Sequence, residues 1–265
     1  MYSDTRTRSC ADFEHQASML APATRMVLEQ AGIERGMRVL DLGTGAGDVA
    51  FEVADMVGSS GSVLGVDQSA SALRWAARRL ETRDISNVTF LRDDLHTVEI
   101  ADRFDAVVGR LVLLYTPHPA EVLRRYAALV RKGGLIVAME YEMRAAGSIP
   151  SVPLSERVVG WITEAFGRSN LDASLGARLE PIMRAAGLTD PTVVGLQSYF
   201  APDDPAGARL AAATVRTLLP VIVRTGVAEP EEIDIDTLEE RCATSLADGC
   251  AIFKPPVLVG AWARI

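Results

Sequence analysis

The chain has 265 residues, of which 48% are apolar and 23% charged, so it can bury a sizeable core and does not have the composition of a disordered tail. Its formal net charge of −8 argues against general nucleic-acid binding, because phosphate backbones repel an acidic protein. The three cysteines form no CxxC pair, so we expect neither a disulfide framework nor a metal site. No signal peptide or membrane-spanning segment is expected, which predicts a cytoplasmic protein without membrane contact.

The first half of the chain alternates apolar β-type runs with helical segments. A helix is predicted over residues 12–32 and is ended by glycine. Strands are then predicted at 38–42, 62–67, 87–91, 104–109 and 135–140, and helices at 49–57, 69–81 and 120–130, the last closed by Gly133 and Gly134. Strands separated by helices imply βαβ units and a parallel sheet, and their nearly all-apolar character is typical of strands covered on both faces.

The pattern changes after Glu140. It predicts a loop at 142–153, helices at 155–169, 174–187, 205–225 and 235–246, and strands at 192–200 and 257–263. The helical stretch at 205–248 is short and sparse in apolar volume, so we interpret it as a lid-like insert rather than a separate domain. The fold class predicted is therefore α/β, with a doubly wound, mostly parallel sheet of seven strands.

The most informative stretch runs from Asp41 through Gly43, Gly45 and Gly47 into a predicted helix. Glycines adopt backbone conformations that a Cβ forbids and let a ligand approach closely, and a helix N-terminus offers free N–H groups. Asp67 ends the next strand, where a carboxylate in nucleotide-binding α/β folds accepts hydrogen bonds from both ribose hydroxyls. A tight turn without ligand and a helix N-cap are the structural alternatives.

Two classes of cofactor use such a scaffold. A dinucleotide pyrophosphate requires GxGxxG, but the position of the third glycine holds Asp48, whose carboxylate would repel it. The pattern here is DxGxGxG, and its acidic first residue, Asp41, suits a ligand with a cationic end, such as a sulfonium.

Residues 41–47 resemble the first motif of the class I S-adenosylmethionine-dependent methyltransferases, and motifs similar to later ones of that family follow in order to about residue 140. The resemblance is closest to the small-molecule branch around the ubiquinone/menaquinone C-methyltransferases. It implies a Rossmann-like methyltransferase fold in a single domain. Within it we expect an N-terminal helical cap at 1–35, a cofactor-binding core at 36–140 and a substrate-side region at 141–265.

The resemblance also implies the cofactor, S-adenosyl-L-methionine, with S-adenosyl-L-homocysteine as product, and a set of residues that hold it. Asp94 would accept from the adenine amino group, with Asp93 as the alternative, and Arg110 would lie beside the methionine moiety. The full set implied is Gln16, Asp41, Gly43, Thr44, Gly45, Gly47, Asp67, Gln68, Asp94, Leu95 and Arg110.

A carbon or oxygen nucleophile needs a general base unless it is already ionised. Tyr115 and His118 follow the fourth predicted strand at its carboxyl end, where ligands bind in such sheets, and are the candidate catalytic residues. His15, His96 and His118 are the three histidines considered as bases, and each alone also fits a surface residue. Glu140 fits either a base or a solvated strand-end carboxylate. The basic run of Arg74, Arg78 and Arg79 is interpreted as a solvated helix face.

These observations predict a methyltransferase that acts on a small, apolar or aromatic metabolite by in-line displacement. The acceptor atom and a homodimer are left open. One alternative is a protein that binds S-adenosylmethionine but has cyclase-like chemistry or a regulatory role, because a fold does not fix its chemistry. The other is a nicotinamide-dependent oxidoreductase, which Asp48 disfavours.

Overall fold

The structure is a computed structural model that describes the backbone of residues 10–265 and the side chains of residues 20–265. The described chain divides into two compact units. We call residues 17–140, 176–194 and 259–265 the sheet unit, and residues 10–16, 141–175 and 195–258 the helical unit.

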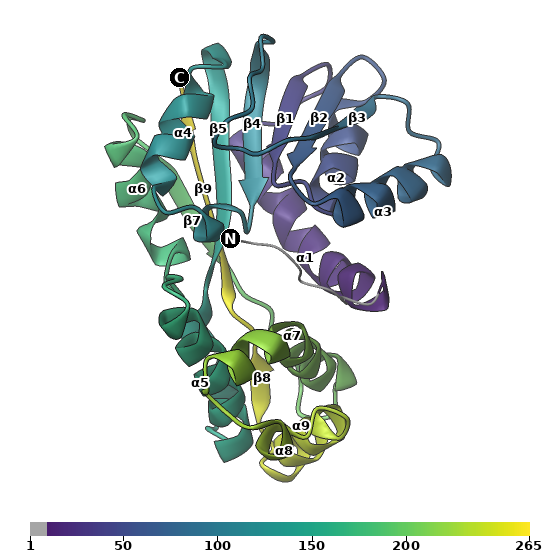
Figure 1. The fold of residues 1–265 in the computed structure, drawn as a ribbon, viewed down its shortest axis with the longest axis vertical. Coiled ribbons are helices and arrows are strands. Elements are labelled where there is room, and N and C mark those ends of the chain that lie inside the picture. The colour runs from purple at the N-terminus through teal and green to yellow at the C-terminus, as the bar shows by residue number, and fades with distance from the viewer. Residues whose placement is uncertain (1–9) are drawn as a thin grey trace. The chain divides into compact units, whose positions relative to one another are not determined.

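A seven-stranded sheet has the order β3-β2-β1-β4-β5-β9-β7 (Figure 1). Its strands are β1 (Arg38–Leu42), β2 (Ser62–Asp67), β3 (Val88–Arg92), β4 (Phe104–Arg110), β5 (Val130–Glu142), β7 (Thr192–Leu196) and β9 (Val257–Arg264). The pairs β1–β2, β2–β3, β1–β4 and β4–β5 are parallel. The strand order reverses between β1 and β4, and ligands bind at the carboxyl ends of strands at such a point. The predicted doubly wound α/β fold is confirmed.

Helices of the sheet unit bury apolar faces against these strands. They are α1 (Cys10–Ala31), α2 (Asp48–Val57), α3 (Ala70–Glu81), α4 (Pro119–Ala127) and α6 (Leu179–Ala185), with 3-10 turns η1 (Leu113–Tyr115) and η3 (Gly176–Arg178). In α2, Val49, Val53 and Val57 recur at helical spacing and are buried. Gly260 of β9 has no room for a Cβ, which would lie 2.5 Å from Val27 of α1, so this glycine lets helix and strand approach closely.

The predicted C-cap of the fourth helix is wrong. Helix α4 ends at Ala127, and Gly133 and Gly134 lie inside β5, where the register with β4 shifts between Phe104 and Ala106. A Cβ on Gly134 would lie 2.4 Å from the carbonyl oxygen of Asp105. The glycines therefore serve an irregularity between two strands that approach closely, because a glycine pair suits a β-bulge as well as a helix end.

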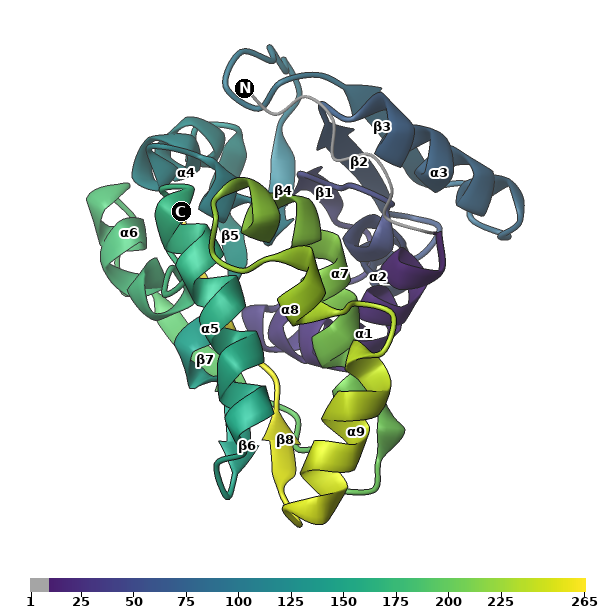
Figure 2. The same ribbon diagram turned by 60° about the horizontal axis from the view of Figure 1, so that its bottom comes forward.

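The helical unit contains α5 (Pro153–Arg168), α7 (Pro205–Arg224), α8 (Pro230–Ile233) and α9 (Leu238–Asp248), with the 3-10 turn η2 (Met143–Ala145). Figure 2 shows α5, α7 and α9 gathered around a small sheet of β6 (Gly147–Ile149) and β8 (Ile252–Lys254), which pair antiparallel. The predicted loop at 142–153 is wrong at β6, and β8 was not predicted. Three-residue strands are too short to show a periodic pattern.

Helix α7 is mostly apolar but includes Arg209, Arg216 and Arg224. An 18-residue window within it has a mean hydropathy of 1.4 and is 33% buried, so by length and composition alone it could cross a membrane. The sequence prediction concerned an uncharged apolar segment, and α7 is not one, because Arg209 and Arg216 lie within it. In the helical unit, α7 packs against α5 and α9.

Candidate functional site

The glycine-rich turn between β1 and α2 has the backbone conformation that its sequence predicts. Gly43, Gly45 and Gly47 have φ of +64°, +54° and +83°, in the left-handed region that favours glycine. A Cβ at Gly43 would lie 2.5 Å from Val112, whereas at Gly45 the nearest atom would be 3.9 Å away. The backbone at Gly45 thus faces open space, and a ligand can approach it closely.

Asp67, at the end of β2, is joined to this turn. Its Oδ2 accepts a hydrogen bond from the N–H of Gly45 at 2.9 Å, and its Oδ1 accepts from the N–H of Ser69 at 2.8 Å. Each oxygen of an ionised carboxylate has a second lone pair, so both can still accept from a vicinal diol. Gln68, which follows Asp67, is exposed.

Asp41 and Thr44 add buried polar atoms at the carboxyl end of β1. Asp41 is only 1% exposed, and burial raises the pKa of its carboxyl group to about 7. The Oδ2 of Asp41 and the hydroxyl of buried Thr44 have no hydrogen-bond partner among the described residues. The charge of Arg110 already lowers the pKa of Asp41 against the effect of burial, and a cationic ligand would favour the ionised form of Asp41 further.

The turn after β3 presents Asp94 at the surface. Its Oδ1 accepts from the N–H of His96 at 2.8 Å, and the neighbouring Asp93 accepts from the N–H of Asp94. Tyr126 of α4 is buried and donates its hydroxyl to the carbonyl oxygen of Leu95 at 2.9 Å, and burial raises its pKa to about 12. Sequence reasoning missed Tyr126, since a tyrosine on an apolar helix face resembles ordinary core.

Arg110, at the end of β4, interacts with two side chains that the sequence did not predict as its partners. It donates to the hydroxyl of Thr24 in α1 at 2.8 Å and lies 3.9 Å from Asp48. Arg79 binds Asp48 at 2.5 Å and the carbonyl oxygen of Ala46 at 2.7 Å. The interpretation of Arg79 as part of a solvated face is therefore wrong. The predicted repulsion of a pyrophosphate by Asp48 is also weakened, because two guanidinium groups neutralise this carboxylate.

The segment after β4 carries both candidate catalytic residues. Tyr115 ends η1 and is 43% exposed, and His118 is exposed at the N-terminus of α4. Glu140 of β5 is 1% exposed and accepts from the N–H groups of Val112 and Leu113 at 2.9 and 2.7 Å. It is therefore not a solvated carboxylate, and burial raises its pKa to about 8.

The structure brings the glycine-rich turn together with Asp67, and Arg110 together with Asp48. The side chains of Gln16 and His15 lie outside the described residues. His96 is exposed, and no group of three or more histidine, cysteine or acidic residues among the described ones could hold a metal ion.

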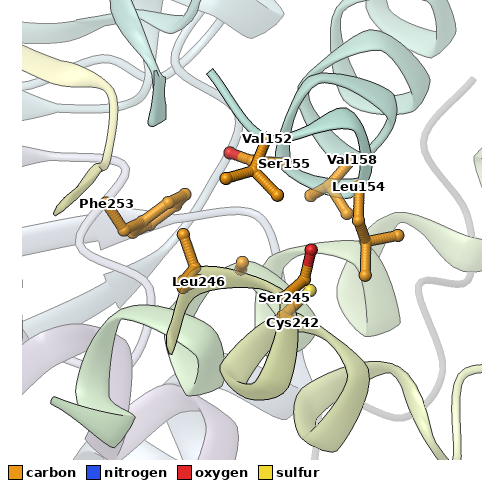
Figure 3. A pocket seen from close by; sticks show the side chains of 9 residues that line it. Val152, Leu154, Ser155, Val158, Cys242, Ser245, Leu246 and Phe253 are labelled. Carbon is orange, nitrogen blue, oxygen red and sulfur yellow. The ribbon is translucent and has the colours of Figure 1, made fainter. Parts of the chain in front are cut away.

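A narrow cavity lies inside the helical unit, between α5, α7, α9 and β8 (Figure 3). It is lined mostly by apolar side chains, with Ser155, Ser245 and Cys242 among them. The hydroxyl of Ser155 is buried without a hydrogen-bond partner in the described chain, and burial raises the pKa of the Cys242 thiol to about 11.

The fold agrees with what the sequence matches. Residues 33–165, half of the chain, match the family described as "Methyltransferase domain", and the chain belongs to this family. The arsenite methyltransferase of Aquipseudomonas alcaligenes is 34% identical over 152 residues, which are 50% of this chain and 44% of that protein. The aklanonic acid methyltransferase DauC of Streptomyces sp. is 32% identical over 133 residues, 50% of this chain and 60% of its own length. The chain thus spans about half the length of the curated relatives it matches.

Solved structures show the same fold. The phosphoethanolamine N-methyltransferase 2 of Haemonchus contortus, in complex with S-adenosyl-L-methionine, superimposes with a TM-score of 0.59 at 19% identity, covering 96% of this chain and 57% of that one. The YcgJ protein of Bacillus subtilis gives a TM-score of 0.53 at 15% identity, covering 95% and 99%. Identity this low supports the fold alone.

Proposed function

We propose that the protein transfers a methyl group from S-adenosyl-L-methionine to a small organic molecule. The observation that carries this is the contact of Asp67 with the N–H of Gly45, at a turn whose backbone is open to a ligand. A carboxylate for a diol, a glycine turn and the buried acid Asp41 together fit a nucleoside with a cationic sulfur.

Each residue of the site would have a separate role in binding the cofactor. Asp67 accepts hydrogen bonds from the ribose hydroxyls, and Asp94 and the N–H of Leu95 flank the adenine. Thr44 and Asp41 supply polar atoms near the turn, and Arg110 fixes α1 through Thr24. The bound sulfonium would supply an electrophilic methyl group, so the protein has to orient the acceptor and exclude water. Tyr115 and His118 stand as candidate bases on the substrate side.

An organic acceptor is supported by one of the matched relatives, which is an aklanonic acid methyltransferase. Cys242 is buried, which raises the pKa of its thiol to about 11, and Cys250 is exposed. The side chain of Cys10 lies outside the described residues. We therefore expect the acceptor to be a small aromatic or apolar metabolite. A cytoplasmic location and a homodimer stay predictions from the sequence.

Titration of the purified protein with S-adenosylhomocysteine and, separately, with NAD tests the cofactor. We expect saturable binding of S-adenosylhomocysteine only. Asp67→Ala should weaken it by about a hundredfold, because two charge-assisted hydrogen bonds to the diol are lost. Asp84→Ala removes an exposed carboxylate and is the matched control. Equal binding by wild type and Asp67→Ala would refute the site.

Methyl transfer itself is tested by incubation with S-adenosylmethionine and a panel of phenols, quinols and polyketide acids. Mass spectrometry should detect a product in which one hydrogen is replaced by a methyl group. Cofactor binding with no methylated product across the panel would instead favour the non-methylating alternative.

A further inference from the structure

The turn after β4 is held in place by a buried carboxyl group of β5. Oε1 of Glu140 accepts from the N–H groups of Val112 and Leu113, and the N–H of Leu111 donates to the carbonyl oxygen of Met139 at 2.8 Å. Leu111 has a φ of +55°, a conformation that a leucine rarely adopts. Three consecutive N–H groups of this turn are therefore bound by the end of β5.

In the same turn, the side chain of Val112 packs against the glycine-rich turn between β1 and α2. Val112 is buried, and its Cγ2 lies where it would be 2.5 Å from a Cβ on Gly43. Its Cγ1 would be 2.9 Å from a Cβ on Gly109. Val112 thus fills the space that both glycines leave, at the adjoining carboxyl ends of β1 and β4, which Figure 1 shows side by side. A glycine is needed at position 43 for two reasons. Its missing Cβ leaves room for Val112, and it adopts a positive φ without strain.

The second carboxylate oxygen of Glu140 makes no hydrogen bond within the described chain. Its side chain is almost wholly buried, and Oε2 has no hydrogen-bond partner among the described residues. A hydrophobic residue would fill the volume without the cost of burying a carboxyl group, but it could not bind the two N–H groups. The hydrogen bonds to the N–H groups of Val112 and Leu113 therefore explain why this buried position has an acidic residue.

We propose that Glu140 is a positioning residue of the cofactor site, which holds Val112 against Gly43 and so fixes the glycine-rich turn that receives the cofactor. The inference rests on the proposed function, because it assigns the cofactor to this turn. Glu140 acts through Val112, and it does so from a strand that the cofactor motif itself does not include.

Two near-isosteric variants separate this role from simple packing. Glu140→Met keeps the volume and loses the acceptor, so we expect about tenfold weaker binding of S-adenosylhomocysteine by calorimetry and faster amide exchange at Val112 and Leu113 by NMR. Glu140→Gln keeps a carbonyl oxygen for the two N–H groups and should restore affinity to within about threefold of wild type. Glu99→Met, at an exposed acid, is the control and should change neither measurement.

Val112→Ala keeps the hydrogen bonds and removes the contact with Gly43, so it tests the second step even if Glu140→Met fails to fold. It should weaken binding, and combination with Glu140→Met should be less than additive, since both changes act on one contact. Wild-type affinity in either single variant overturns the inference. Faster exchange at Val112 with unchanged affinity overturns it too. A wild-type protein that does not bind S-adenosylhomocysteine overturns the proposed function along with it.

Discussion

The two units bury different kinds of residue. Of the five polar or charged residues buried in the described chain, the sheet unit contains Thr24, Asp41, Thr44 and Glu140, and the helical unit contains only Ser155. Buried polar groups cost free energy unless they are bound, so a concentration of them marks a place where binding has shaped the sequence. The helical unit instead encloses a narrow, mostly apolar cavity. The sheet unit therefore has the features of a binding site for a polar ligand, and the helical unit those of an apolar core.

The sharpest test of the sheet unit is Gly43→Ala. A methyl group there meets Val112 at 2.5 Å in a backbone with φ of +64°. We expect a loss of about 3 kcal/mol of unfolding free energy, measured with urea, and no detectable binding of S-adenosylhomocysteine. Gly187→Ala is the control, because Gly187 has a φ of +91° but nothing within 4 Å of an added Cβ. It should cost about 1 kcal/mol and leave binding intact. Equal effects of the two changes would contradict the role of Val112.

The second test uses pH. Burial raises the pKa of Glu140 from 4.5 to about 8, so between these values the unfolded chain has released a proton that the folded chain keeps. Unfolding is therefore favoured as pH rises through this window, and the stability lost is complete above pH 8. Relative to wild type, Glu140→Gln should gain about 3 kcal/mol on going from pH 5 to pH 8, because it cannot ionise. Denaturant titrations at both pH values measure this gain. A part of the wild-type slope should persist in the variant, since Asp41 has a pKa raised in the same direction.

The third test concerns the ion pair at the start of α2. Arg79 is 14% exposed and binds both Asp48 and the carbonyl oxygen of Ala46, so Arg79→Met should cost about 1–2 kcal/mol by leaving a half-buried carboxylate with only the more distant Arg110. Arg78→Met, at the exposed neighbouring position, should stay within about 0.5 kcal/mol of wild type in the same urea titration. An Arg79 variant as stable as Arg78→Met would restore the interpretation of a solvated helix face.

The sequence predicts the sheet unit well because its information is local. A strand, a glycine turn and a helix follow one another around Gly45, and Asp67 lies at the spacing that puts it beside the turn. The contact of Glu140 with Val112 joins residues 28 positions apart and needs the neighbouring arrangement of β4 and β5. No motif contains it, and an isolated acid at a strand end looks solvated until burial is known.

The helical unit was harder to predict. Strands β6 and β8 have three residues each and pair across about a hundred positions, so neither shows an alternating pattern.

The ionic role of Arg79, which belongs to the sheet unit, was missed for a different reason. Its position on α3 fits a solvated basic face, and only the fold brings Asp48 beside it.

The smallest effect is expected in the helical unit and has the opposite sign. Ser155 lines the cavity with a buried hydroxyl that has no partner in the described chain, so Ser155→Ala removes a desolvated polar group and should raise the unfolding free energy by about 1 kcal/mol. Ser174→Ala removes a hydroxyl that donates to Glu142 at 3.1 Å and should lower it by about as much. Urea titration measures both. Because the cofactor is assigned to the sheet unit, neither change should alter the affinity for S-adenosylhomocysteine. If Ser155→Ala destabilises the protein or weakens that affinity, the hydroxyl is bound by something polar, and the helical unit is more than an apolar core.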